Sequence, residues 1–197
     1  MTTAAAISAL ASGTVRAAGR TLCAATLAAA LLAVSPAAQP ATDPAARDAA
    51  NLGLQKLGEG RMTYFGISLY TASLWSETTA GEPDPDAEPV MLQINYERNV
   101  SRDRIMKITR KEWRRLEVAD PAQQQAWLND LEALLPDVRR GDVLSSLTVP
   151  GKETRFYHAG REIGRIADPA FGEAFLAIWL DPRTRAAKLR EALLTQS

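Results

Sequence analysis

Residues 154–180 read TRFYHAGREIGRIADPAFGEAFLAIWL, and we expect the rest of the chain to be organised around them. Residues 154–158 are rich in strand-forming threonine, phenylalanine and tyrosine, so they predict a β-strand. Ala159-Gly160 suits a tight turn, because glycine adopts positive φ without steric cost. Residues 161–166 are then expected to run back as the antiparallel partner strand.

Asp168-Pro169 predicts the start of a helix, because aspartate accepts hydrogen bonds from free backbone N–H groups and proline suits the first helical position. The segment that follows is apolar on all sides, and Glu173 in its first turn is its only charged residue. Such a helix belongs in a core and is too short to span a bilayer, which needs roughly 20 apolar residues. We expect a sheet to fold over its main face, formed by Phe171, Ala174, Phe175, Ile178 and Trp179.

The N-terminus has the three parts of a secretory signal peptide. Arg16 and Arg20 precede an apolar run, Leu22–Val34, and the small residues of 35–37 follow it. A membrane anchor is the alternative, but the run is short for one. We therefore expect cleavage after Ala37 and a periplasmic or secreted protein.

Removal of this segment changes the chemistry available to the chain. The single cysteine, Cys23, lies within it, so the mature protein would have neither a disulfide nor a cysteine nucleophile. The whole chain has 23 basic and 23 acidic residues, and only two arginines are charged before residue 38, which leaves 21 basic and 23 acidic. This near-balance argues against nucleic acid as a partner.

The chain is expected to have three parts: a signal peptide at 1–37, a flexible leader without periodic pattern at 38–50, and one domain at 51–197. Strands joined by tight turns, with helices in clusters, predict the α+β class and not an alternating α/β fold. The remaining expected elements are a glycine turn at 58–60, an extended stretch at 61–75 (one long strand or a hairpin), strands at 90–96 and 143–149, and helices from Ser101 to about 117, from Asp120-Pro121 to Pro136, and at 183–195.

The helix that follows Ser101 carries the one basic cluster of the sequence. Its inner stripe is expected to comprise Ile105, Ile108, Thr109, Trp113 and Leu116, and lysines and arginines crowd the rest. A solvated helix face explains such a cluster most simply. Contact of this basic helix with an anionic head group or a membrane surface is the alternative.

Most catalytic schemes fail because the required residues are missing. His158 is the only histidine, so a multi-histidine metal site is excluded, and no Gly-x-Ser-x-Gly elbow or phosphate-binding loop is present. The acidic loop at 78–89 lacks the glycine and glutamate spacing of a calcium-binding EF-hand and is expected to be a solvated loop. We therefore predict no catalytic residue, no metal and no cofactor.

Several short motifs occur in the order of one known family: Leu52-Gly53-Leu54 with Gly58, Gly60 and Arg61; Leu69–Trp75; Leu135-Pro136-Asp137 with Arg140-Gly141-Asp142; and Thr154–Gly160, Gly164 and Phe175–Leu180. With these motifs the mature chain resembles the bacterial chalcone isomerase-like proteins along nearly its whole length. The resemblance implies an open-faced β-sandwich in which a large antiparallel sheet is backed by helices. The family includes plant enzymes that cyclise chalcones without a cofactor, and fatty-acid-binding relatives.

The resemblance also implies two site residues. Arg61 loosely matches the arginine with which the plant enzymes prepare their site, and Tyr70 stands where those enzymes have a threonine. The helical tyrosine and asparagine of the plant enzymes have no convincing counterpart here. Arg61 and Tyr70 are therefore expected to bind a ligand, without being assigned as catalytic.

Three functional hypotheses follow. The first, which we prefer because catalytic groups are missing, is an exported non-catalytic domain that binds a small apolar or acidic ligand, such as a fatty acid, in a cleft between sheet and helices with a cation at its end. The second is a cofactor-independent intramolecular lyase of the chalcone isomerase type, which requires Arg61 and Tyr70 to converge on one cavity. The third is a structural or partner-binding domain without a cavity.

Overall fold

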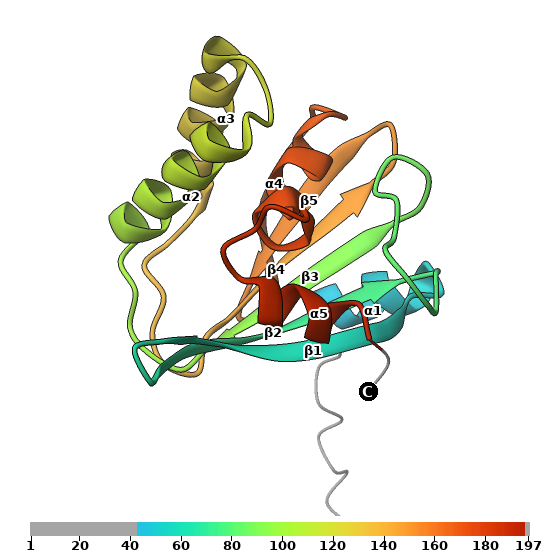
Figure 1. Cartoon of the computed structure of the whole chain (residues 1–197). Coiled ribbons are helices and arrows are strands. Elements are labelled where there is room, and N and C mark those ends of the chain that lie inside the picture. The colour runs from blue at the N-terminus through green and yellow to red at the C-terminus, as the bar shows by residue number, and fades with distance from the viewer. Residues whose placement is uncertain (1–42, 196–197) are drawn as a thin grey trace, which may run out of the picture. The chain divides into compact units, whose positions relative to one another are not determined.

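One antiparallel sheet of six strands organises the domain, in the order β1-β2-β3-β4-β5-β6. The computed structural model describes residues 43–195, and each strand pairs with its neighbour in sequence (Figure 1). The α+β class and the antiparallel sheet backed by helices are therefore confirmed. The strands are β1 (Gln55–Tyr64), β2 (Ile67–Ser76), β3 (Val90–Tyr96), β4 (Val143–Val149), β5 (Glu153–His158) and β6 (Arg161–Ile166).

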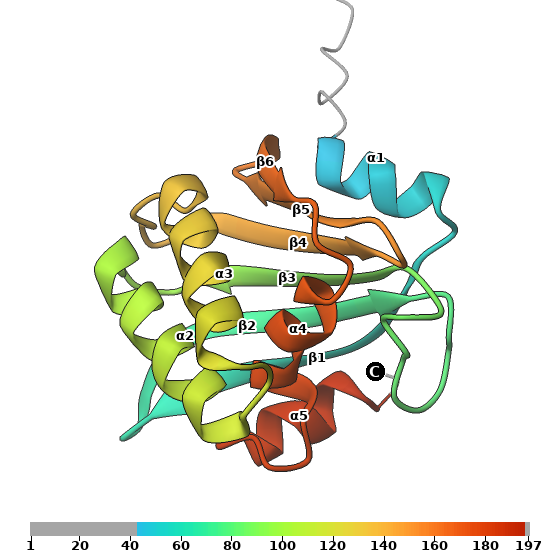
Figure 2. The ribbon, with the colours of Figure 1, turned by 90° about the horizontal axis from the view of Figure 1, so that it is seen from above.

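Most of the helices lie over one face of the sheet (Figure 2), and one helix packs on the other face. The larger hydrophobic cluster joins one face of the sheet to α2–α5, and a smaller cluster joins the other face to α1. Among the described residues, both clusters lie between positions 45 and 194, within the compact unit formed by residues 38–197. The helices are α1 (Pro44–Asn51), α2 (Arg102–Leu116), α3 (Pro121–Leu134), α4 (Phe171–Leu180) and α5 (Ala187–Leu193).

Helix α4 is buried as its composition predicts. Phe171 packs edge-on against Phe156 of β5, with ring centroids 6.0 Å apart, and against Trp113 of α2 at the same distance. The buried Trp113 indole donates a 2.8 Å hydrogen bond to the carbonyl oxygen of Ala174 in the middle of α4. The helix is therefore held by aromatic packing and by one buried polar contact.

The predicted start of α4 is wrong by two residues. The helix begins at Phe171, with Ala170 as its N-cap residue and no side-chain cap. One oxygen of the Asp168 carboxylate does accept a 3.0 Å hydrogen bond from a backbone N–H, that of Ala170. The other oxygen accepts a 2.9 Å hydrogen bond from the Trp127 indole of α3 and one of 2.7 Å from the Gln123 side chain. Its carboxylate therefore ties the loop before α4 to α3.

Residues 61–75 form most of a hairpin, and the glycine turn predicted at 58–60 is wrong. Chain reversal takes place at Phe65-Gly66, while 58–60 lie inside β1. The two glycines there allow α5 to lie directly on β1, since a Cβ on Gly58 would overlap the carbonyl oxygens of Ala192 and Leu193. Their role is close approach of backbone to backbone.

The flexible leader expected at 38–50 is wrong for residues 44–50, which lie in α1. Asp43 caps this helix, and Ala45 and Ala49 are buried against the sheet. The Tyr157 hydroxyl donates a 2.6 Å hydrogen bond to Asp48, which fastens the helix to β5. The expected signal peptide and its cleavage site lie outside the described residues.

The remaining elements follow the sequence closely. Strands β3, β4, β5 and β6 have the predicted bounds within one residue, and Ser101 and Asp120 cap α2 and α3 as predicted. Ile108 is not on the inner stripe of α2, because its side chain is 49% exposed, whereas Met106 is buried. The last helix is shorter than expected and spans only 187–193.

Substitution Gly58→Ala should lower the free energy of unfolding by about 1–3 kcal/mol, because the added methyl group forces α5 away from β1. Urea-induced unfolding monitored by circular dichroism measures this change. Glu59→Ala is the control, because Glu59 is an exposed neighbour on the same strand and should change stability by no more than about 0.5 kcal/mol. Equal stability of Gly58→Ala and wild type would contradict the proposed role of the glycine.

Candidate functional site

Tyr70 lies on the helix-covered face of the sheet, at the point where α4 ends. It stands opposite Tyr96 of β3, and the two ring centroids are 6.0 Å apart. The Trp179 indole, near the C-terminus of α4, donates a 3.0 Å hydrogen bond to the Tyr70 hydroxyl. Met62 of β1 is the other cross-strand neighbour of Tyr70 and packs against the same hydrophobic cluster. We call Tyr70, Tyr96 and Trp179 the tyrosine corner.

The environment of the tyrosine corner keeps both phenols protonated. Burial raises the pKa of Tyr70, an effect that the hydrogen bond from Trp179 opposes in part. Burial also raises the pKa of Tyr96, with a smaller contribution from the neighbouring Tyr70. Within residues 43–195, neither hydroxyl proton has a hydrogen-bond acceptor. The corner therefore offers two O–H donors in a largely apolar setting, and neither phenol is suited to act as a base.

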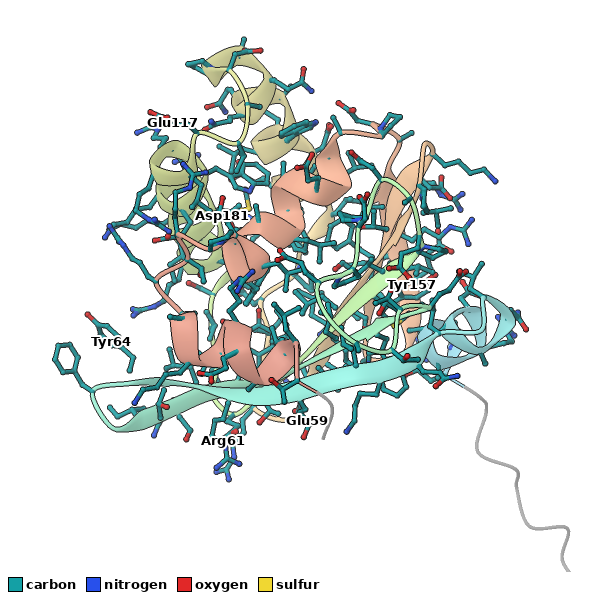
Figure 3. All side chains as sticks on the ribbon, turned by 45° about the vertical axis from the view of Figure 1, so that its right-hand side comes forward. Glu59, Arg61, Tyr64, Glu117, Tyr157 and Asp181 are labelled. Atoms are coloured by element: carbon teal, nitrogen blue, oxygen red, sulfur yellow. The ribbon has the colours of Figure 1, made fainter. Side chains whose placement is uncertain are left out.

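Arg61 lies on the opposite face of the sheet. Its guanidinium Nε is 2.9 Å from a Glu97 carboxylate oxygen, and the Thr71 hydroxyl donates a 3.0 Å hydrogen bond to the same oxygen. The Arg61 side chain is 63% exposed, and Figure 3 shows it directed away from the helices. The structure thus does not bring Arg61 and Tyr70 together.

The alternation of β1 explains this separation. Successive side chains of a strand point to opposite faces, and the residue that pairs with Tyr70 is Met62. Arg61 pairs with Thr71, which belongs to the other face. Sequence reasoning missed Tyr96 and Trp179 as members of the site. Helical periodicity predicts only that Trp179 faces the core, and the register that joins Tyr70 to Tyr96 cannot be read from either strand alone.

Two surface hollows lie away from the tyrosine corner. One, of about 480 Å³, is formed by the acidic loop that follows β2, including Glu82, Asp84 and Glu88. The other, of about 450 Å³, lies between α2 and α3 and includes Arg110, Arg114 and Glu117. Neither corresponds to the cleft between sheet and helices that the preferred hypothesis expects.

The single histidine is engaged in a structural contact. Its Nε2 is 3.1 Å from a carboxylate oxygen of Asp142, which also accepts a hydrogen bond from the backbone of Arg139. These contacts lower the pKa of Asp142; the hydrogen bond from the backbone N–H of Arg139 has the largest effect, and the contact with His158 has the next largest.

Over residues 43–195, no three histidine, cysteine, aspartate or glutamate side chains are grouped as metal ligands would be. Within the same range, no helix has the length and apolar character needed to cross a bilayer.

A family model described as chalcone isomerase-like matches residues 37–195. The chain belongs to the chalcone isomerase-like family. The match extends over the whole domain described above, which confirms the resemblance based on its motifs.

This chalcone isomerase-like protein is similar to two further proteins, one by sequence and one by structure. A protein of Haemophilus influenzae, itself uncharacterised, is 29% identical over 140 residues, which cover 71% of this chain and 67% of the relative. The crystal structure of a fatty-acid-binding protein from Arabidopsis thaliana is similar with a TM-score of 0.57 and 13% identity, covering 72% of this chain and 86% of that chain. At 13% identity, the similarity to the Arabidopsis thaliana protein shows a shared fold.

The raised pKa of Tyr96 predicts a dependence of stability on alkaline pH. A phenol whose pKa is higher in the folded than in the unfolded state stabilises the fold below the unfolded-state value of about 10, and this contribution is lost as the pH rises further. Tyr96→Phe should therefore weaken the decline of unfolding free energy above about pH 10. Urea unfolding of both proteins between pH 8 and about pH 11 tests this. Identical slopes for variant and wild type would contradict it.

Proposed function

We propose that the protein is an exported, non-catalytic domain that binds a small molecule with an apolar body and an acidic end, such as a fatty acid. The observation that carries the proposal is the tyrosine corner, where two protonated phenols have protons to donate and no acceptor within the described residues. A carboxylate within reach of both hydroxyls would accept a hydrogen bond from each. Hydrogen bonds to a charged group are stronger than those between neutral groups.

The surroundings of the corner suit an apolar ligand body. Met62 is the cross-strand neighbour of Tyr70, and both Met62 and Ile178 of α4 are only partly buried against the larger hydrophobic cluster. The fatty-acid-binding protein from Arabidopsis thaliana shares this fold, which supports a small apolar ligand as the class to test.

A binding role is favoured over a lyase because of the separation of Arg61 and Tyr70. The lyase hypothesis needs both on one cavity, and the sheet lies between them. Tyr70 and Tyr96 also have pKa values raised by burial, which opposes formation of the phenolate that a catalytic base would need. Export is supported by the pattern of residues 16–37.

Protein recovered from the periplasm of its own cells and analysed by native mass spectrometry tests the proposal. We expect a polypeptide that begins at Ala38 and a co-purifying small acid. After delipidation, palmitate should bind to wild type, and Tyr70→Phe with Tyr96→Phe in one chain should weaken it roughly tenfold or more, because two hydrogen bonds to the carboxylate are lost. The corresponding fatty alcohol should be affected less.

The matched control is Tyr157→Phe, which removes a phenol on the other face of the sheet and should leave palmitate binding unchanged. Palmitate binding that is equal in the double variant and wild type would exclude the tyrosine corner as the site. Absence of any small molecule together with turnover of a chalcone would favour the lyase instead.

A further inference from the structure

The end of the β1–β2 hairpin exposes an unusual amount of apolar surface. Phe65 is 87% exposed, Tyr64 59% and Ile67 46%. The rings of Tyr64 and Phe65 contact each other edge-on, with centroids 4.5 Å apart, and Figure 3 shows Tyr64 at the free end of the hairpin, clear of the helices. We call residues 64–67 the aromatic tip. Of the four large hydrophobic side chains that are exposed within residues 43–195, three belong to it.

The aromatic tip also has a strained backbone. Phe65 has a φ of 47° and Gly66 a φ of 74°, so both central residues of the turn lie in the left-handed region. Glycine and asparagine adopt this region readily, whereas a bulky residue does so at a cost in free energy. The hairpin of β5 and β6 has the same arrangement with Ala159 and Gly160, at φ values of 48° and 76°. The turn itself therefore does not require an aromatic residue, and Phe65 carries two costs, strain and exposure.

The size and shape of the aromatic tip argue against a second protein as its partner. Its three exposed side chains present on the order of 400 Å² of surface, given that an aromatic side chain has roughly 150–250 Å². A stable protein interface buries about 800 Å² on each partner. The tip is also the end of a protruding hairpin, which would need a matching pocket on a rigid partner, whereas a lipid interface adapts to it.

The charges around the aromatic tip suit an anionic surface. Residues 62–68 contain no acidic side chain. The exposed Arg98 donates a 3.2 Å hydrogen bond to the carbonyl oxygen of Ser68, which holds its guanidinium at the base of the tip. Tyrosine and other amphipathic side chains favour the boundary between lipid head groups and acyl chains, and arginine favours lipid phosphates.

We propose that the aromatic tip inserts into the surface of a lipid bilayer, with Arg98 at the level of the head groups. This is a peripheral contact of three side chains, so it is weak and reversible, and it differs from contact through the basic face of α2. The proposal stands independently of the ligand. One cross-strand pair, Thr63 and Ser68, separates the aromatic tip from the pair Met62 and Tyr70, so a docked tip would place the tyrosine corner close to the membrane.

Sedimentation with vesicles tests the proposal. The experiment uses residues 38–197, which contain both hydrophobic clusters, so that the apolar run at 22–34 cannot itself bind lipid. Vesicles contain phosphatidylcholine alone or equal parts of phosphatidylcholine and phosphatidylglycerol. Wild type should bind both, and the anionic vesicles more tightly. Phe65→Asn should weaken binding roughly tenfold or more, because the largest inserted side chain is lost.

The same variant should keep or raise the midpoint of urea unfolding, because asparagine tolerates the left-handed conformation. Loss of lipid binding therefore cannot be attributed to loss of folding. Ala159→Asn is the matched control, since it introduces the same residue at the equivalent position of the other hairpin and should leave vesicle binding unchanged. A second control, Ile108→Asn, removes the fourth exposed apolar side chain, on α2, and should also have no effect.

Three results would overturn the proposal. The first is absence of vesicle binding by wild type. The second is binding that Phe65→Asn leaves unchanged, as expected if the basic face of α2 makes the contact. The third is self-association of wild type in analytical ultracentrifugation that Phe65→Asn abolishes, which would make a second copy of the chain the partner.

Discussion

The structure depends on the burial of α4 between the sheet and the other helices. Its rings contact aromatic residues of β5, α2 and α3, and the Trp113 indole holds its backbone at Ala174. A helix without a polar face is stable only if every side is covered. The six strands, paired in sequence order, form one continuous sheet that covers one side of α4. Asp168 and Trp127 then fix the loop that leads into it.

The burial of α4 also limits which parts of the sheet remain open to other molecules. The face covered by α2–α5 is filled by large side chains, and the tyrosine corner is one place on it where polar groups meet. The other face is covered in part by α1 and carries Arg61 in a contact with Glu97. The tyrosine corner and Arg61 are thus separated by the thickness of one sheet, which argues against catalysis by a paired arginine and tyrosine.

Local patterns in the sequence predicted most elements, because alternation, caps and glycine turns act over a few residues. Ser101 and Asp120 mark helix starts correctly, and the alternating apolar residues define β3. The errors arise from contacts between distant segments. Gly58 is adapted to α5, more than 130 residues away in sequence, and α1 is a helix because its alanines pack on the sheet. The sequence led us to expect Tyr70 and Arg61 at one ligand site, but strand register, which local patterns do not reveal, places them on different faces of the sheet.

Hydrogen exchange of the Trp113 indole N–H reports whether α4 stays packed against α2, because this N–H lies between α2 and the middle of α4. If burial of α4 holds the fold together, the indole should exchange only through global unfolding, with the same dependence on urea as the slowest amides of β3 and β4. Exchange that is fast and independent of urea would mean that α4 opens by itself, and would contradict the account.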